Sequence, residues 1–189
     1  ETLDPVRAAD YRDLVRVSEP ALSPDGREAA FVRTVPDGDE EYESTVYVAP
    51  TDPTEGEPRR FTAVEGRDFE PRYSPSGDRL AFRSVRGDDE RPQLWVVPTG
   101  GGEARRVTRV VGGVDAFEWC PDGERIAFVQ RATAGEREAG HDRSWDTGAY
   151  ERESPDPRVV DRMIYRAGGE YLDGRRSHVY VLDLGAEAG

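Results

Sequence analysis

The chain of 189 residues is poor in the residues that build disulfide frameworks and metal centres. Cys120 is its only cysteine, so no disulfide can form within the chain. This excludes a disulfide-stapled secreted domain and favours a cytoplasmic location. Two histidines, His141 and His178, and one cysteine are too few for a typical zinc centre. We therefore expect no metal and no cofactor.

Positive charge is also scarce, and lysine and asparagine are absent. The 26 basic residues are all arginine and face 39 acidic residues, which gives a formal net charge of −13. Such a chain repels phosphate backbones and anionic lipids, so we expect neither nucleic acid nor a membrane as partner. No stretch approaches the roughly 18 apolar residues of a membrane span, and no signal peptide opens the chain. The acid excess favours a halophilic source.

Against these absences stands a repeated motif. Three turns containing Pro and Gly begin at Ser23, Ser74 and Cys120, which are 51 and 46 residues apart, and each precedes an apolar-Ala-Phe strand. Pro at the second turn position and Gly at the fourth favour a tight turn between antiparallel strands. Alternation in the strand places Leu80 and Phe82 on one face and Ala81 on the other. A small residue at the Ala position allows a neighbouring sheet to approach closely.

Each turn belongs to a unit of four short strands. A third strand is expected at residues 46–49 and again at 94–97, and a fourth begins with an Arg-Arg pair at residues 59–62 and 105–108. Four short strands in about 45 residues are typical of a β-propeller blade. We therefore predict an all-β fold: a partial β-propeller of about three four-stranded blades, the third incomplete and carrying a long insertion.

The repeat also predicts the domain boundaries. Residues 1–17 form a lead-in segment with a short helix, and residues 18–189 form the partial propeller. The three blades are expected at about residues 18–62, 66–110 and 113–189. In the third, an insertion at 131–177 separates the second strand from the third. Three blades cannot close a ring, because propellers have typically 4–8 blades, so we interpret the chain as an N-terminal fragment of a longer protein.

The repeats resemble those of TolB-like propellers and of the N-terminal propeller of the prolyl oligopeptidase superfamily. Residues 161–166 and 171–183 are similar to acylaminoacyl-peptidase-type members of that superfamily. The resemblance implies a C-terminal α/β-hydrolase domain on the same polypeptide, with a Ser-Asp-His triad that hydrolyses short peptides. The hydrolase domain is absent from this chain, because the sequence contains no Gly-x-Ser-x-Gly. We predict no catalytic residue here and no activity of the chain alone.

In that family the propeller covers the active site and restricts access to small peptides. The resemblance therefore makes the insertion the predicted place of substrate contacts, and its candidate residues are Tyr165, Arg166, Glu170, Arg175 and Arg176. An arginine there can bind a peptide carboxylate through two parallel hydrogen bonds. The competing interpretation is a solvated, charged loop. The acidic run Asp39-Glu40-Glu41 is a weaker candidate for binding a substrate amine.

The other conspicuous residues fit structural roles. Cys120 replaces the serine of a repeat turn, His178 opens an apolar strand, and Trp95 and Trp119 recur in register. Two functions remain open. The first is a gating, substrate-access propeller of a serine exopeptidase of acylaminoacyl- or dipeptidyl-peptidase type. The second is a TolB-like propeller that binds a protein partner without an enzyme domain; a lone structural domain is a third possibility. The segment that follows Gly189 distinguishes them.

Overall fold

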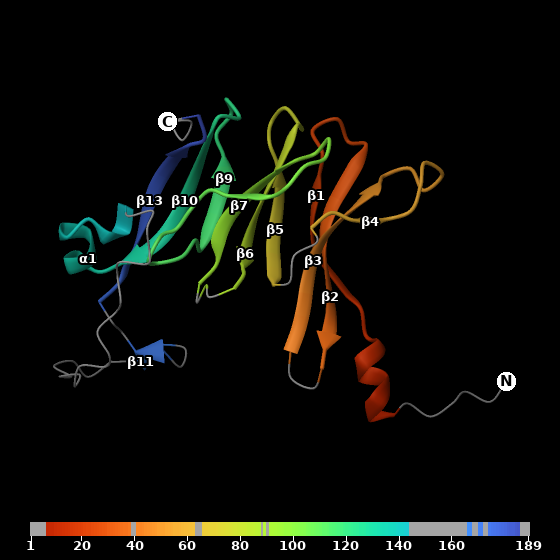
Figure 1. The fold of residues 1–189 in the computed structure, drawn as a ribbon, viewed down its shortest axis with the longest axis horizontal. Coiled ribbons are helices and arrows are strands. Elements are labelled where there is room, and N and C mark those ends of the chain that lie inside the picture. Colours follow the sequence, from red (N-terminus) through yellow and green to blue (C-terminus); the bar gives the residue numbers. More distant parts are fainter. Residues whose placement is uncertain are drawn as a thin grey trace.

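The computed structural model describes residues 7–38, 41–62, 66–87, 89, 91–143, 166–167, 170–171 and 174–185. Three groups of strands, antiparallel within each group, stand side by side along the molecule, with the first at one end and the third at the other (Figure 1). A parallel bridge between Ser44 and Arg67 joins the first two groups into one sheet. No helix among these residues is long and apolar enough to cross a membrane. The predicted all-β, partial-propeller fold is confirmed.

Blade 1 consists of strands in sequence order: β1 (Arg16–Leu22), β2 (Glu28–Asp37), β3 (Glu41–Pro50) and β4 (Arg59–Arg60). The turn between β1 and β2 is built by its own side chains. The Ser23 hydroxyl accepts the Glu28 N–H at 2.9 Å and donates to Asp25 at 2.6 Å. Gly26 adopts the left-handed conformation that the turn requires, with φ of 71°. The lead-in segment before the blade contains a 3-10 helix, η1 (Ala8–Asp13).

Blade 2 repeats this order with β5 (Arg67–Tyr73), β6 (Arg79–Val85), β7 (Gln93–Pro98) and β8 (Arg105–Arg106). Its first strand carries the same irregularity as β1. Glu19 and Glu70 both have positive φ, 55° and 47°, at a β-bulge next to a proline. The Glu70 N–H donates to Glu19 Oε2 at 2.5 Å, so the bulges join the first strands of neighbouring blades.

Blade 3 has three strands among the described residues: β9 (Ala116–Trp119), β10 (Arg125–Ala132) and β13 (Arg176–Asp183). Two short helical segments follow β10, namely α1 (Ala134–Glu138) and η2 (His141–Arg143). The strands β11 (Arg166–Ala167) and β12 (Glu170–Tyr171) pair as a separate hairpin. The insertion therefore separates β10 from β13, which are nevertheless paired along eight residues.

The core lies between the blades, and β6 contributes to it on both faces. Leu80 and Phe82 are fully buried against blade 1, in a cluster that contains Ala30, Val46 and Val48. Ala81 is fully buried on the opposite face, in a cluster with residues of blade 3 that include Trp119, Ile126 and Phe128. The alternation predicted for the apolar-Ala-Phe strand is confirmed. Ala30 and Ala81 face the next blade, whereas Phe82 and Phe128 face the preceding one.

Candidate functional site

The two ends of the insertion are joined by a buried ion pair. Thr133 caps α1: its hydroxyl accepts the Glu136 N–H at 3.1 Å, and Glu136 Oε2 accepts the Thr133 N–H at 2.8 Å. The other carboxylate oxygen of Glu136 accepts a hydrogen bond from Arg175 Nη2 at 2.7 Å. The side chains of Glu136 and Arg175 are only 5% and 3% exposed. The start and the end of the insertion are therefore fixed to each other.

The charge state of Glu136 follows from this geometry. Burial alone would raise the pKa of the Glu136 carboxyl. The hydrogen bond from the Thr133 N–H and the Arg175 guanidinium outweigh burial and hold the pKa below its usual value. Glu136 is thus ionised at neutral pH, and the contact is a true ion pair.

A second buried contact fastens η2 to β13. Tyr180 Oη donates to Asp142 Oδ2 at 2.6 Å, and the Asp142 side chain is only 2% exposed. Gln130 Nε2 of β10 donates to the Asp142 carbonyl at 2.5 Å. Burial, followed by the hydrogen bond to Asp142, raises the pKa of Tyr180 to about 12. The segment around η2 is therefore anchored to both long strands of blade 3.

The structure separates the predicted substrate-binding residues. Arg175 is buried and bound to Glu136, whereas its neighbour Arg176 is exposed at the start of β13, opposite Ala132. Arg166 and Glu170 occupy opposite strands of the β11–β12 hairpin. Tyr165 lies outside the described residues. Of the two candidates whose side chains the structure describes, Arg175 and Arg176, it is Arg176 that is accessible to a ligand.

The remaining sequence candidates have mainly structural surroundings. His178 is half-buried within β13, opposite Gln130. Cys120 lies in its repeat turn, where its carbonyl accepts the Gly123 N–H at 2.9 Å. Glu41 begins β3 and is exposed, while Asp39 and Glu40 lie outside the described residues. Within the part of the chain that the structure describes, no group of three or more His, Cys, Asp or Glu residues is placed to hold a metal ion.

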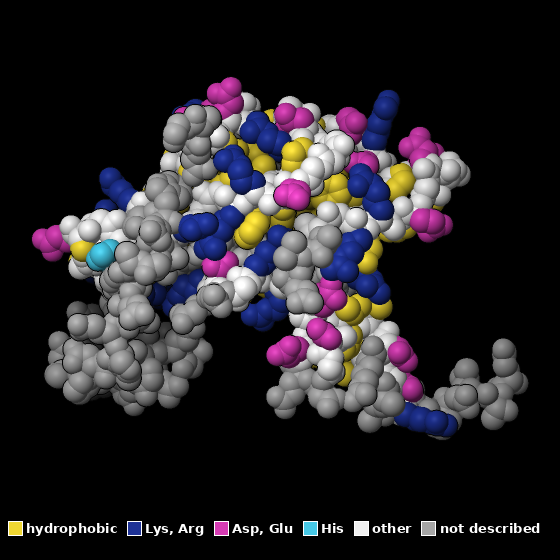
Figure 2. Space-filling model, viewed as in Figure 1, with side chains coloured by type: hydrophobic (Ala, Val, Ile, Leu, Met, Phe, Trp, Pro, Cys, Tyr) yellow, Lys and Arg dark blue, Asp and Glu magenta, His cyan; other side chains and the backbone are white. Residues whose placement is uncertain are grey.

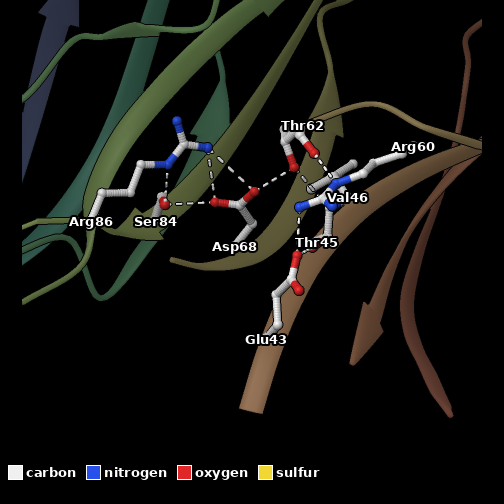
Figure 3. Close-up of polar contacts among 8 residues, drawn as sticks. All are labelled: Glu43, Thr45, Val46, Arg60, Thr62, Asp68, Ser84 and Arg86. Carbon is white, nitrogen blue, oxygen red and sulfur yellow. Dashed lines mark hydrogen bonds and ion pairs between the residues drawn. The ribbon is translucent and has the colours of Figure 1, made fainter. Parts of the chain in front are cut away.

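A buried polar network between blades 1 and 2 was not predicted. Asp68 is 1% exposed and accepts hydrogen bonds from Thr62, Ser84 and Arg86 (Figure 3). The guanidinium carbon of Arg86 lies 4.4 Å from the ring centroid of Trp95. Asp68 and Arg86 are 18 residues apart, so no local motif indicates that they meet. The Glu136 contact did have a local signal, the capping box Thr-x-x-Glu.

Arginine is a recurrent link between blades. Arg79 donates to the Gly123 carbonyl at 2.6 Å, and Arg83 donates to the Val114 carbonyl at 2.9 Å, so both reach from blade 2 to blade 3 or the segment before it. Figure 2 shows arginine side chains gathered over the middle of one face, whereas most acidic side chains lie nearer its margins. Arg79 and Arg83 thus place positive charge where blade 2 meets blade 3.

Known proteins share this architecture. The model of the TolB beta propeller domain matches residues 13–149. The "Uncharacterized peptidase YuxL" of Bacillus subtilis is 35% identical over 168 residues, which are 88% of this chain and 24% of that protein. "Dipeptidyl-peptidase 5" of Porphyromonas gingivalis is 31% identical over 127 residues, 67% of this chain and 18% of that protein.

The solved structure of Pyrococcus horikoshii acylaminoacyl peptidase shares the fold, with a TM-score of 0.69 at 19% identity, over 93% of this chain and 24% of that one. The chain thus spans about a quarter of the length of these proteins or less. The sequence resemblance to propellers of peptidases is confirmed. Because the family model matches well over half of the chain, the chain belongs to the TolB beta propeller domain family.

Proposed function

We propose that this chain is the N-terminal propeller of a serine exopeptidase of acylaminoacyl- or dipeptidyl-peptidase type that hydrolyses short peptides. The observation that carries the proposal is the 35% identity to a peptidase over 88% of this chain, although the chain covers only 24% of that peptidase. The remaining length of such a protein has room for a C-terminal α/β-hydrolase domain. A serine in that domain would form the acyl-enzyme.

The propeller's own part in the proposal is to restrict access and orient the substrate. A propeller that excludes large substrates must be rigid, and the contacts between its blades support such rigidity. They include the hydrogen bond from Thr62 after blade 1 to the buried Asp68 carboxylate of blade 2, and the arginine links from blade 2 to blade 3. Among the candidate residues, exposed Arg176 suits a contact with a peptide carboxylate, while Arg175 acts through Glu136 as a positioning residue. Tyr165, Arg166 and Glu170 remain candidates.

The first experiment is labelling of the full-length polypeptide with a fluorophosphonate probe for activated serines. We expect labelling of the full-length protein and none of the 189-residue chain. Cleavage of acylated or free-amine peptide substrates should fall steeply as the peptide is lengthened. Absence of labelling, or equal cleavage of short and long peptides, would contradict the proposal. Hydrolysis by the 189-residue chain itself, surviving Cys120→Ser, would also contradict it.

A matched pair of substitutions tests the neighbouring arginines in the full-length enzyme. Arg176→Ala is expected to raise KM with the melting temperature unchanged, because its side chain is exposed. Arg175→Ala is expected to lower the melting temperature, because it leaves the buried Glu136 carboxylate without its cation. Equal KM values for Arg176→Ala and the parent enzyme would remove Arg176 from the candidate residues.

The second candidate function is a protein-binding propeller without an enzyme domain. The family match favours it, because that model describes a propeller domain alone. This candidate predicts that the full-length polypeptide contains only further blades and fails to react with the probe. A labelled serine in a C-terminal domain would reject it.

The cytoplasm is the proposed compartment of the protein. The argument rests on Cys120, which is a free, half-buried cysteine in a chain that has no second one. Domains of oxidising compartments commonly rely on disulfides, and this chain has none to offer. Fractionation of cells that express the full-length protein tests the proposal.

A further inference from the structure

Gln130, near the end of β10, is a polar side chain that is completely buried, with 0% exposure. The two ends of its amide group contact different parts of the molecule. Oε1 accepts the N–H of Gly112, in the segment that joins blade 2 to blade 3, at 3.3 Å. Nε2 donates to the carbonyl of Asp142 in η2, at the start of the insertion. A single side chain therefore connects the insertion to the segment between the blades.

The segment between the blades is itself held tightly at this point. A Cβ added to Gly112 would lie 2.3 Å from the Arg131 carbonyl oxygen and 2.9 Å from Gln130 Oε1, so position 112 has room only for glycine. Two residues later, the Val114 N–H donates to the Pro92 carbonyl of blade 2 at 2.7 Å. The Oε1 end of Gln130 is therefore fixed relative to blade 2.

The repeat shows that the glutamine is specific to blade 3. Two residues after the repeated phenylalanine, blade 2 has Ser84 and blade 3 has Gln130. Ser84 is buried and donates to Asp68 of its own blade at 2.6 Å. The residue of blade 3 that corresponds to Asp68 by strand register, Asp115, is exposed. Blade 2 thus uses this position for a contact within the blade, whereas blade 3 uses it for a contact with the insertion.

Asp142 connects this contact to the surroundings of exposed Arg176. Its carboxylate accepts the Tyr180 hydroxyl of β13 at 2.6 Å, and Arg137 Nε of α1 lies 3.8 Å from the same carboxylate oxygen. The helix α1 in turn binds Arg175, the neighbour of Arg176, through its buried ion pair. A shift of η2 would therefore disturb both α1 and the strand that begins with Arg176.

We propose that Gln130 is a positioning residue for substrate binding, because it fixes the base of the insertion, and with it Arg176, relative to blade 2. Gln130 does not touch the peptide and acts through Asp142. A guanidinium that binds a carboxylate through two parallel hydrogen bonds needs a fixed direction of approach, and a displacement of about 1 Å is costly. The inference rests on the proposed function and deepens it by naming a buried residue on which substrate affinity depends.

Gln130→Leu in the full-length polypeptide tests the proposal, with Gln93→Leu as the matched control. Gln93 is 3% exposed, and its side-chain hydrogen bonds go to Thr108 and Val110 in the segment between the blades, not to the insertion. For a short peptide substrate, Gln130→Leu is expected to raise KM at least about fivefold and to change kcat less than about twofold. Gln93→Leu should leave KM within about twofold of the parent value. An unchanged KM for Gln130→Leu, or an equal rise for Gln93→Leu, would overturn the proposal.

A double variant tests whether Gln130 acts through Arg176. The increases in KM caused by Gln130→Leu and Arg176→Ala should not add, because both variants disturb the same contact with substrate. Full additivity would overturn the proposal. Labelling by the fluorophosphonate probe separates the two failures. A full-length protein that is not labelled contradicts the proposed function, whereas a labelled protein whose KM does not respond to Gln130→Leu contradicts this inference alone.

Amide hydrogen exchange gives a readout that needs no activity. The Ala139 N–H of α1 and the Arg143 N–H of η2 donate to backbone carbonyls within the start of the insertion. In the full-length polypeptide, Gln130→Leu should make these amides exchange at least about tenfold faster, whereas Gln93→Leu should leave them unchanged. If Gln130→Leu prevents folding, Gln130→Met, which keeps the length of the side chain, replaces it in both experiments. Unchanged exchange at both amides would overturn the proposal.

Discussion

The boundary between blades 1 and 2 and the boundary between blades 2 and 3 meet the same need with different chemistry. At each, a threonine that closes the fourth strand accepts an N–H of the third strand and donates its own proton onward. Thr62 donates to the buried carboxylate of Asp68, while Thr108 donates to the amide oxygen of Gln93 at 2.9 Å. The buried threonine hydroxyl needs an acceptor for its own proton, and that acceptor can be a charged carboxylate or a neutral amide.

The Asp68 and Gln93 networks should differ in how much stability is lost when one of their side chains is replaced. Asp68 is paired with Arg86, whose side chain is 7% exposed. Gln93 instead exchanges two neutral hydrogen bonds of 3.0 Å with the backbone of Val110. An intact buried ion pair contributes little net stability, but removing one partner leaves an uncompensated charge. The first boundary should therefore be the more sensitive one.

The largest expected effect is that of Asp68→Leu. It removes the carboxylate from Arg86, Thr62 and Ser84, and is expected to lower the free energy of unfolding by about 3–5 kcal/mol. Urea denaturation measures the loss. A double variant that also carries Arg86→Met should lose less than the sum of the two single variants, because no charge is then stranded. Strict additivity would show that the two side chains are not coupled.

Gln93→Leu is the counterpart at the second boundary. It leaves the N–H and carbonyl of Val110 and the hydroxyl of Thr108 without their partner, and is expected to cost about 1–3 kcal/mol. No ionised group is stranded, so the loss should be smaller than that of Asp68→Leu in the same denaturation experiment. A loss equal to or greater than that of Asp68→Leu would remove the distinction between the boundaries.

The two threonines give a finer comparison. Thr62→Val and Thr108→Val each remove one hydroxyl of nearly unchanged shape. Hydrogen bonds to charged groups contribute more than neutral ones, so Thr62→Val is expected to cost about 1 kcal/mol more than Thr108→Val. Thermal and urea unfolding of the pair measure the difference. Equal costs would mean that Asp68 gains nothing from its charge in this bond.

Most of the fold could be predicted from the sequence, because its determinants are local and repeated. The Ser-Pro-x-Gly turns, the apolar-Ala-Phe strands and the Arg-Arg strands each appear within a few residues, and the structure has them where expected. The lead-in helix is a 3-10 helix of six residues, and such short helices have only a weak signature in the sequence. The bulges at Glu19 and Glu70 coincide with a Glu-Pro pair in the sequence. Their positive φ, however, depends on how each strand pairs with its neighbour, which the sequence pattern does not reveal.

The candidate site was harder to predict, because its contacts join residues far apart in sequence. Arg175 is one of the predicted candidates, and its partner Glu136 lies 39 residues earlier across the insertion. Asp142 and Tyr180 are 38 residues apart. Charge alone does not tell a buried arginine from an exposed one, and only the fold separates Arg175 from Arg176. The resemblance to a family indicates which segment contacts a ligand, whereas the burial of each side chain in that segment decides whether it can reach the ligand.

The smallest expected effect concerns alkaline pH, where the two boundaries should behave alike. Burial, with the Glu28 carboxylate next in effect, raises the pKa of Tyr73 at the first boundary to about 12. Tyr180 at the second boundary also has its pKa raised to about 12. In the unfolded chain both ionise near their ordinary value of 10.0. Stability is therefore fully present below about pH 10 and is lost as the pH rises toward 12.

Substitution by phenylalanine separates the two tyrosines. Tyr73→Phe is expected to weaken the alkaline loss and to change stability at neutral pH little, since the described residues give the buried Tyr73 hydroxyl no hydrogen bond of good geometry. Tyr180→Phe should weaken the alkaline loss as well, but it also removes the donor to Asp142 and so costs stability at neutral pH. Urea unfolding at a series of pH values from about 7 to 11 gives both quantities. If Tyr73→Phe leaves the pH slope unchanged, the first boundary opens to water before its tyrosine ionises, and its buried ion pair does not keep that boundary closed.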